Sequence, residues 1–196
     1  MRTRAKMTQP TSQLDKSLWR TARGERCELH VCGGACCVNG IWVDLGHVQR
    51  ILDAAPQVRP FMAAQYADNE DHWFGDETLE TADFPSGLGL PTAVAPRADG
   101  SGRQGCVFVR ADHKCSLQMA SDALGLAWPG LKPFDCATYP ILRSDGVVQV
   151  DDESARHHPG ADCQQGGPTQ RRMREVFAEE IALCLPPGVA LPETPE

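Results

Sequence analysis

The sequence predicts a small, loop-rich α+β single domain with short helices and β-hairpins around a cysteine-ligated metal core. Three observations lead to this prediction. The chain of 196 residues contains nine cysteines, and four of them fall within eleven residues. Glycine and proline are frequent, at 18 and 15 residues, while the hydrophobic fraction is only 41%. Such a chain builds a modest apolar core, and metal binding adds folding free energy to a fold of this kind.

The two ends of the chain differ in composition from the middle. Residues 1–24 are predicted to be a flexible basic arm. The first 26 residues hold seven Lys or Arg against Asp15 and Glu25, a balance of +5 that leaves −12 for the remainder of a chain with net charge −7. Residues 185–196 contain four prolines and are predicted to be an extended tail. The segment 25–184 is then expected to form the cysteine-cluster domain.

The first predicted helix covers residues 45–55 and is capped by Asp44. Its apolar side chains recur at i, i+3, i+4 and i+7, so one face is expected to be buried. Residues 61–67 are predicted to form one or two further helical turns. Residues 68–105 are acidic and then rich in glycine and proline. They are predicted to be loop with one short strand near 92–95.

The second half of the chain contains two predicted hairpins and two predicted helices. Apolar runs around short polar turns indicate the hairpins, and an apolar period of 3.6 indicates the last helix. The first hairpin would bring Cys106 and Cys115 close together on neighbouring strands. The predicted strands are 106–109, 114–117, 139–143 and 147–150, and the predicted helices are 119–124 and 169–184.

Eight cysteines form the candidate metal-ligand set. Thiolates are soft ligands that select zinc, copper(I) or iron–sulfur clusters. Gly33 and Gly34, inside the first group of cysteines, permit tight turns and leave N–H groups for metal-bound sulfur. Two adjacent cysteines chelate one tetrahedral ion awkwardly, so their presence favours a polynuclear centre or two metals. The candidate ligands are Cys27, Cys32, Cys36, Cys37, Cys106, Cys115, Cys136 and Cys163.

Alternatives remain open for a few residues. His157 or His158 can replace one cysteine as a ligand, because both precede Cys163 in a short loop-like segment. Cys115 with His113 resembles a thiol–histidine pair, although crowded thiols more readily bind metal or oxidise. Cys184 completes the apolar face of the last predicted helix, so we expect a small hydrophobic core residue there and no ligand.

The order of these motifs resembles the YkgJ-type cysteine-cluster family, which is described as zinc- or iron-chelating. The resemblance spans about residues 26–165 and is closest to a longer branch of that family without an assigned activity. It implies a metal-ligand role for the same eight cysteines. A related cysteine motif occurs in flagellin lysine methylase, where it is associated with an iron–sulfur cluster and S-adenosylmethionine chemistry. The motifs that carry the resemblance are Cys32-Gly-Gly-Ala-Cys36-Cys37, Gly105-Cys106-Val-Phe, Lys114-Cys115-Ser-Leu and Lys132-Pro-Phe-Asp-Cys136-Ala-Thr-Tyr-Pro140.

Charge and hydropathy narrow the function classes. A net charge of −7 opposes nucleic-acid binding, which needs a concentrated basic face. No apolar run reaches the roughly 18 residues of a membrane span, and no secretory-type apolar stretch follows the first residues. A cytoplasmic location is therefore expected, where thiols stay reduced.

These patterns give three hypotheses for function. The first is a metal-binding protein with an iron–sulfur cluster or, second in order, zinc, whose role is structural or electron-transferring. The second is an enzyme whose cluster supports redox or methyl-transfer chemistry on a protein or a small molecule. The third is a metal-handling or docking module whose basic arm recognises a protein partner. The oligomeric state is left open by the sequence.

Overall fold

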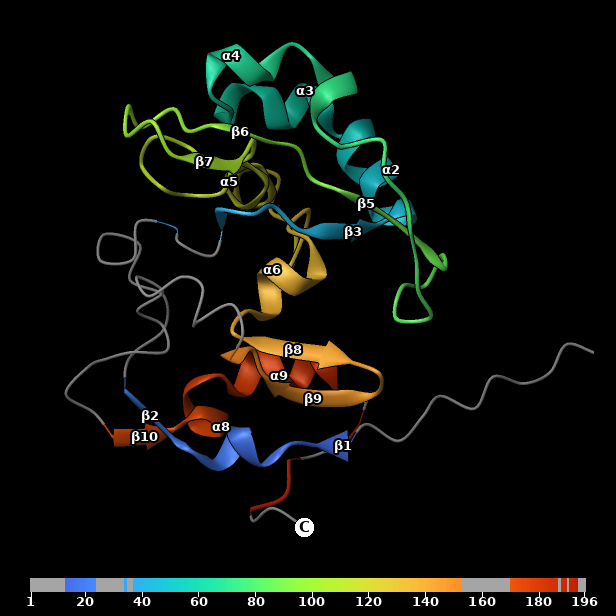
Figure 1. The fold of residues 1–196 in the computed structure, drawn as a ribbon, viewed down its shortest axis with the longest axis vertical. Helices are drawn as coiled ribbons and strands as arrows, with labels where there is room; N and C mark the ends of the chain where they lie inside the picture. The colour runs from blue at the N-terminus through green and yellow to red at the C-terminus, as the bar shows by residue number, and fades with distance from the viewer. Residues whose placement is uncertain are drawn as a thin grey trace, which may run out of the picture.

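The structure is a computed structural model that describes residues 13–23, 34, 37–152, 170–186, 188–189 and 191–193. These residues form a mixed α+β protein with small sheets and short helices, which confirms the α+β part of the predicted fold class, while the described residues show no cysteine-ligated metal core. Their buried apolar side chains gather into two clusters. The helices and strands that carry these side chains form an upper and a lower group in Figure 1. We call the cluster around Ile51 and Phe108 the first core, and the cluster around Val148 and Ile181 the second core.

The first core is enclosed by the elements between residues 42 and 123. A three-stranded antiparallel sheet has the order β3-β5-β4, and β6 pairs with β7 in a separate antiparallel ribbon. The strands are β3 (Trp42–Asp44), β4 (Leu79–Glu80), β5 (Leu88–Pro91), β6 (Val94–Pro96) and β7 (Gln104–Cys106). The helices are α2 (Leu45–Asp53), α3 (Ala55–Val58), η3 (Arg59–Phe61), α4 (Ala64–Ala67), η4 (Glu70–His72) and α5 (Ser116–Ala123).

The second core brings together both ends of the described chain. Strand β9 lies between β8, its antiparallel partner, and β1, its parallel partner, while β2 pairs with β10 (Figure 1). The strands are β1 (Gln13–Leu14), β2 (Thr21–Arg23), β8 (Ile141–Ser144), β9 (Val147–Val150) and β10 (Gln170–Arg172). The helices are η1 (Lys16–Trp19), α6 (Phe134–Thr138), α8 (Met173–Val176) and α9 (Ala178–Cys184).

The predicted helix after Asp44 is confirmed. Helix α2 begins at Leu45, and the Asp44 carboxylate accepts hydrogen bonds from Gly46 N at 2.9 Å and His47 N at 3.3 Å. A carboxylate in this position satisfies main-chain donors that have no partner inside the helix. Val48 and Ile51 are buried on the apolar face, as the spacing predicts.

The hairpin predicted around Asp145 and Gly146 is also confirmed. Strands β8 and β9 pair antiparallel up to Ser144 and Val147, which leaves a two-residue turn. Both turn residues have positive φ, 51° at Asp145 and 77° at Gly146. Two-residue hairpins favour turns of this hand, and Asp-Gly is one of the pairs that adopt them most readily.

The hairpin predicted to join Cys106 and Cys115 differs in the structure. Strand β7 ends at Cys106 and pairs with β6, while only a single bridge joins Val109 to Cys115. Helix α5 begins directly after Cys115, and its first N–H donates to Phe108 O at 2.8 Å. Phe108 is 1% exposed, so the chain turns into the first core where a second strand was expected.

Residues 13–23 were predicted to belong to the flexible arm, but the structure packs them into the second core. Leu14 pairs with Val148 in the register of β1 and β9, and Leu18 is fully buried. The Asp15 carboxylate caps η1 by accepting from Ser17 N at 2.8 Å. Burial of Leu18 anchors this segment to the second core. The prediction of a flexible arm rested on the basic composition of the segment, which does not reveal the burial of one leucine.

The proline-rich end, predicted to be an extended tail, also contacts the second core in its described part. Leu185 is buried, and Leu191 packs against the same cluster. The Trp19 indole N–H donates to Glu193 O at 3.1 Å, and Arg174 donates to Pro192 O.

The last predicted helix is in fact β10, α8 and α9, with a break at Phe177. No helix in the part of the chain described here has both the length and the hydropathy needed to cross a membrane.

Candidate metal centre

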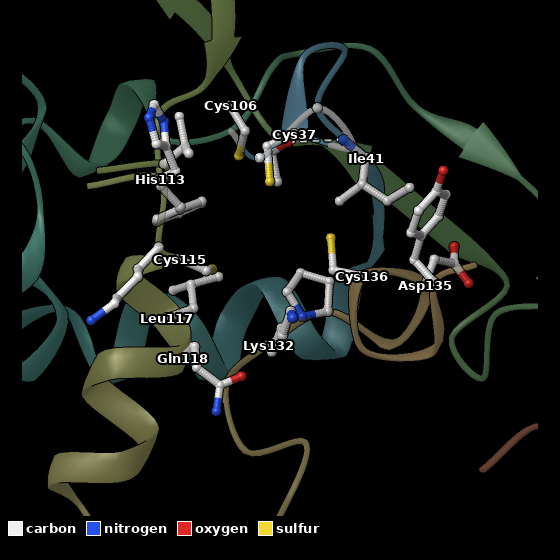
Figure 2. Close-up of a pocket in the computed structure, with 18 of the residues that line it drawn as sticks. Cys37, Ile41, Cys106, His113, Cys115, Leu117, Gln118, Lys132, Asp135 and Cys136 are labelled. Carbon is white, nitrogen blue, oxygen red and sulfur yellow. Dashed lines mark hydrogen bonds between the residues drawn. The ribbon is translucent and has the colours of Figure 1, made fainter. Parts of the chain in front are cut away.

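Four cysteines from four separate segments open into one cavity of about 640 Å³. Their side chains point toward the same open space (Figure 2). All four are half-buried, so each thiol is partly shielded from solvent. The structure therefore brings together half of the predicted ligand set, namely Cys37, Cys106, Cys115 and Cys136.

Local structure fixes the position of each of these thiols. Cys37 N donates to Gly34 O at 3.0 Å, which closes a turn at the rim of the cavity. Cys106 is the last residue of β7, and Cys115 occupies the position before the first turn of α5. Cys136 lies within α6, a helix that begins after Pro133. Because strand, turn and helix all hold these residues, the convergence does not depend on a single flexible loop.

The rest of the cavity wall is mostly apolar. Ile41, Leu117 and Ile141 contribute aliphatic side chains from both sides of the space. Apolar walls exclude water, which strengthens electrostatic interactions inside a site. The polar lining includes Asn39, His113, Lys132, Asp135 and Asp151.

Asp135 is the lining carboxylate with the largest change in acidity. Burial is the largest cause of its raised pKa, the Arg143 guanidinium opposes that effect, Asp83 and Asp151 add to it, and the resulting pKa is about 6. A carboxyl group with a pKa near neutrality can exchange a proton under physiological conditions. The sequence did not predict a role for Asp135 beyond its place in a motif that resembles the YkgJ-type family, because a lone aspartate gives no signal of its burial.

The donor set fits a thiophilic metal, although the described residues do not complete a site. Sulfur donors gathered in a largely apolar cavity suit zinc or iron–sulfur clusters. In the described segments, no three His, Cys, Asp or Glu side chains are close enough to hold a metal ion. The remaining predicted ligands lie outside the described residues, as do the alternative ligands His157 and His158. They are Cys27, Cys32, Cys36 and Cys163.

Cys184 behaves as the sequence predicts. It is 0% exposed in the second core and does not line the cavity. Burial raises the pKa of its thiol to about 12, so it stays protonated at neutral pH. A protonated thiol is a poor metal ligand, and Cys184 therefore serves as an apolar core residue.

Two further polar side chains have contacts inside the fold, namely the half-buried His47 and the buried Arg97. His47 Nε2 lies 2.9 Å from Leu131 O, so this ring is held by a main-chain carbonyl instead of pointing freely to solvent. Arg97 is 5% exposed and contacts His113 at the edge of the cavity. No sequence pattern singled out Arg97, because its contacts with His113 and Gly34 join residues that are distant in the chain.

Comparison with known proteins adds no relative. The chain matches no family model, no curated protein and no solved structure. The interpretation of the cavity therefore depends on its residues and their geometry.

Proposed function

We propose that this protein binds metal through a cysteine-ligated centre in the cavity described above. The observation that carries the proposal is the convergence of Cys37, Cys106, Cys115 and Cys136 in one space, from segments up to about a hundred residues apart. Four half-buried thiols that line one largely apolar cavity form a soft donor set, and metal binding there would add folding free energy. The likeness of the motifs to the YkgJ-type family agrees with this function.

Residues next in sequence to the cavity lining supply further proposed ligands. Gly34 and Cys37 both line the cavity. Cys36 is the residue before Cys37, and Cys32 precedes Gly34 by two residues. We include Cys27 and Cys163 in the ligand set as the sequence pattern predicts. Eight available thiols exceed the four ligands of one zinc ion and also the four ligands of one iron–sulfur cluster, and the adjacent Cys36 and Cys37 favour a polynuclear centre or two metals.

The roles of the chain follow from these positions. The thiolates provide the donors, and the aliphatic side chains of Ile41 and Leu117 keep water from the sulfur atoms. When bound, an iron–sulfur cluster supplies one-electron transfer, whereas zinc supplies a structural cross-link.

Elemental analysis of protein purified without oxygen tests the proposal. We expect iron with acid-labile sulfide, and a brown protein, or else zinc in a colourless one. C136S should lower the metal content per chain, because Cys136 opens into the cavity. C184S is the matched control and should leave metal content unchanged, because Cys184 is buried in the second core. A wild-type protein without either metal, or equal losses in both variants, would refute the assignment.

A second candidate function is an enzyme whose metal centre supports redox or methyl-transfer chemistry. The size of the cavity favours it, since about 640 Å³ falls within the range of roughly 300–1,000 Å³ for small-molecule sites. Asp135, with its pKa near 6, provides a proton donor or acceptor in the same space. Titration calorimetry with S-adenosylmethionine on metal-loaded protein tests this function. Binding that is abolished by the cavity-filling variant I41W supports an enzyme, and the absence of binding opposes methyl transfer.

A further inference from the structure

Arg97 is a buried cation next to Gly34, which lines the cavity. Its side chain is only 1% exposed, although arginine is almost never fully buried unless it is paired. Its Nε lies 3.4 Å from the Asp99 carboxylate, and its Nη2 lies 3.1 Å from His113 Nδ1. Nε and Nη2 form one edge of the planar guanidinium, and contacts at both nitrogens hold that edge in one orientation.

The contact with His113 has a fixed direction. A guanidinium has only hydrogen-bond donors, so Arg97 Nη2 donates and His113 Nδ1 accepts. A guanidinium stays charged in proteins, so Arg97 is the positive member of the group that it forms with His113 and Asp99.

Gly34, which lines the cavity, places its own main chain directly against this charge. A Cβ atom on Gly34 would lie 3.2 Å from Arg97 Nη2 and 3.3 Å from His113 O. Gly34 also has φ +66°, a conformation that side-chain-bearing residues rarely adopt. The close approach needs a glycine here, and Gly34 lies between Cys32 and Cys36 in the sequence.

The ion pair offsets part of this charge. Asp99 Oδ2 lies 3.4 Å from Arg97 Nε and 3.8 Å from His113 Nδ1, so the carboxylate faces the edge of the guanidinium that includes Nη2. Hydrogen bonds from Ser101, followed by the charges of Arg97 and Arg103, lower the pKa of Asp99, so this carboxylate stays ionised. The atom nearest to a Cβ on Gly34 is nevertheless Arg97 Nη2, so the cation approaches the main chain most closely there.

We infer that Arg97 is a positioning residue that presents a fixed positive charge to the cysteine-ligated centre. This inference rests on the proposed function. Thiolate-ligated zinc and iron–sulfur centres carry net negative charge, and their stability and reduction potential depend on nearby charge. Arg97 stabilises the more negative state of the centre, and Asp99 partly offsets that effect.

The test uses three single variants of the full chain, each purified without oxygen. R97M removes the positive charge at similar side-chain length, and D99N removes the opposing carboxylate. R59M is the matched control, because Arg59 also forms an ion pair, but with Glu70, which does not line the cavity, whereas Arg97 contacts the lining residues Gly34 and His113. For an iron–sulfur centre the measurement is the reduction midpoint; for zinc it is affinity by chelator competition.

The two charge changes should act in opposite directions. For an iron–sulfur centre, R97M should lower the equilibrium constant for reduction about tenfold, which lowers the midpoint potential by about 59 mV for a one-electron couple. For a zinc centre, R97M should lower the zinc affinity about tenfold. D99N should raise the same quantity, and R59M should leave it at the wild-type value. A purely structural role would lower metal binding in both R97M and D99N.

Each outcome decides between two claims. If wild-type protein holds no metal, the proposed function and this inference both fail. If wild type holds metal but R97M and D99N shift together or match wild type, only the role of Arg97 is overturned. If R97M does not fold by circular dichroism, the sign of the D99N shift alone decides.

Discussion

At the scale of single residues, His47 couples folding to pH. Its Nε2 lies 2.9 Å from the Leu131 carbonyl oxygen, which can only accept, so the ring donates a hydrogen bond there. Burial, the largest cause, lowers the pKa of His47 below 6.5, with Arg50 adding to the effect, while the Leu131 carbonyl and Asp44 oppose it. The unfolded chain therefore binds a proton more readily than the folded protein. The stability that neutral His47 contributes is complete above pH 6.5 and is lost as pH falls through its folded pKa.

This sign predicts the behaviour of H47Q. A glutamine can donate to Leu131 O but does not titrate, so the free energy of unfolding should fall less between about pH 7.5 and about pH 5.5 than in wild type. Urea denaturation at several pH values measures the difference. H72Q is the control, since His72 is exposed on η4, and it should keep the wild-type slope. An H47Q slope equal to that of wild type would contradict this role.

At the scale of elements, the end of α5 depends on Gly130. Ser121 Oγ donates to Leu117 O at 2.7 Å and accepts from Leu131 N at 2.8 Å. A Cβ on Gly130 would lie 2.5 Å from the same Oγ, and Gly130 has φ +61°. The glycine therefore lets the loop approach the helix closely enough for both hydrogen bonds.

G130A should destabilise the fold by both steric overlap and backbone strain. We expect a loss of about 2–4 kcal/mol, from strain together with two disrupted hydrogen bonds. G125A separates the two effects, because Gly125 has φ +63° with open space around it. Strain alone predicts a loss of about 1–2 kcal/mol there. Chemical denaturation gives both values, and equal losses would show that the contact with Ser121 is unimportant.

Local signals were sufficient for some elements and insufficient for others. Helix α2 and the turn at Asp145 follow from a capping carboxylate and an Asp-Gly pair, both of which act on adjacent residues. Strands β1 and β2 are two and three residues long, and pairing with distant strands stabilises them. Such strands carry no periodicity of their own, so they could not be predicted from composition.

The same distinction applies to the candidate site. Cysteine spacing and its glycine insertion predicted which thiols to consider, and four of those residues share a cavity. Arg97 and His113 are sixteen positions apart, and their contact with Gly34 arises only from tertiary packing. Side chains that act on a site from a distant loop leave no local pattern in a single sequence.

At the scale of the whole molecule, the cavity lies where the two cores meet. Cys106 and Cys115 pack against the first core, whereas Cys136 belongs to α6, whose Phe134 packs against the second. The lining likewise includes Phe108 from the first core and Ile141 from the second. A centre bound by these thiols would join the two cores with metal–sulfur bonds.

Metal removal should therefore uncouple the two cores. Calorimetry of metal-loaded protein is expected to show one cooperative unfolding transition, because neither core can open without breaking ligand bonds. After chelation under reducing conditions, we expect a lower midpoint and two resolved transitions. I51V weakens only the first core, at a cost of about 0.5–1.5 kcal/mol. In the chelated protein it should lower the midpoint of one of the two transitions. In the metal-loaded protein it should lower the midpoint of the single transition. Unchanged calorimetric traces after complete metal removal would show that the cores are coupled by packing alone, and the proposed cross-link would then be wrong.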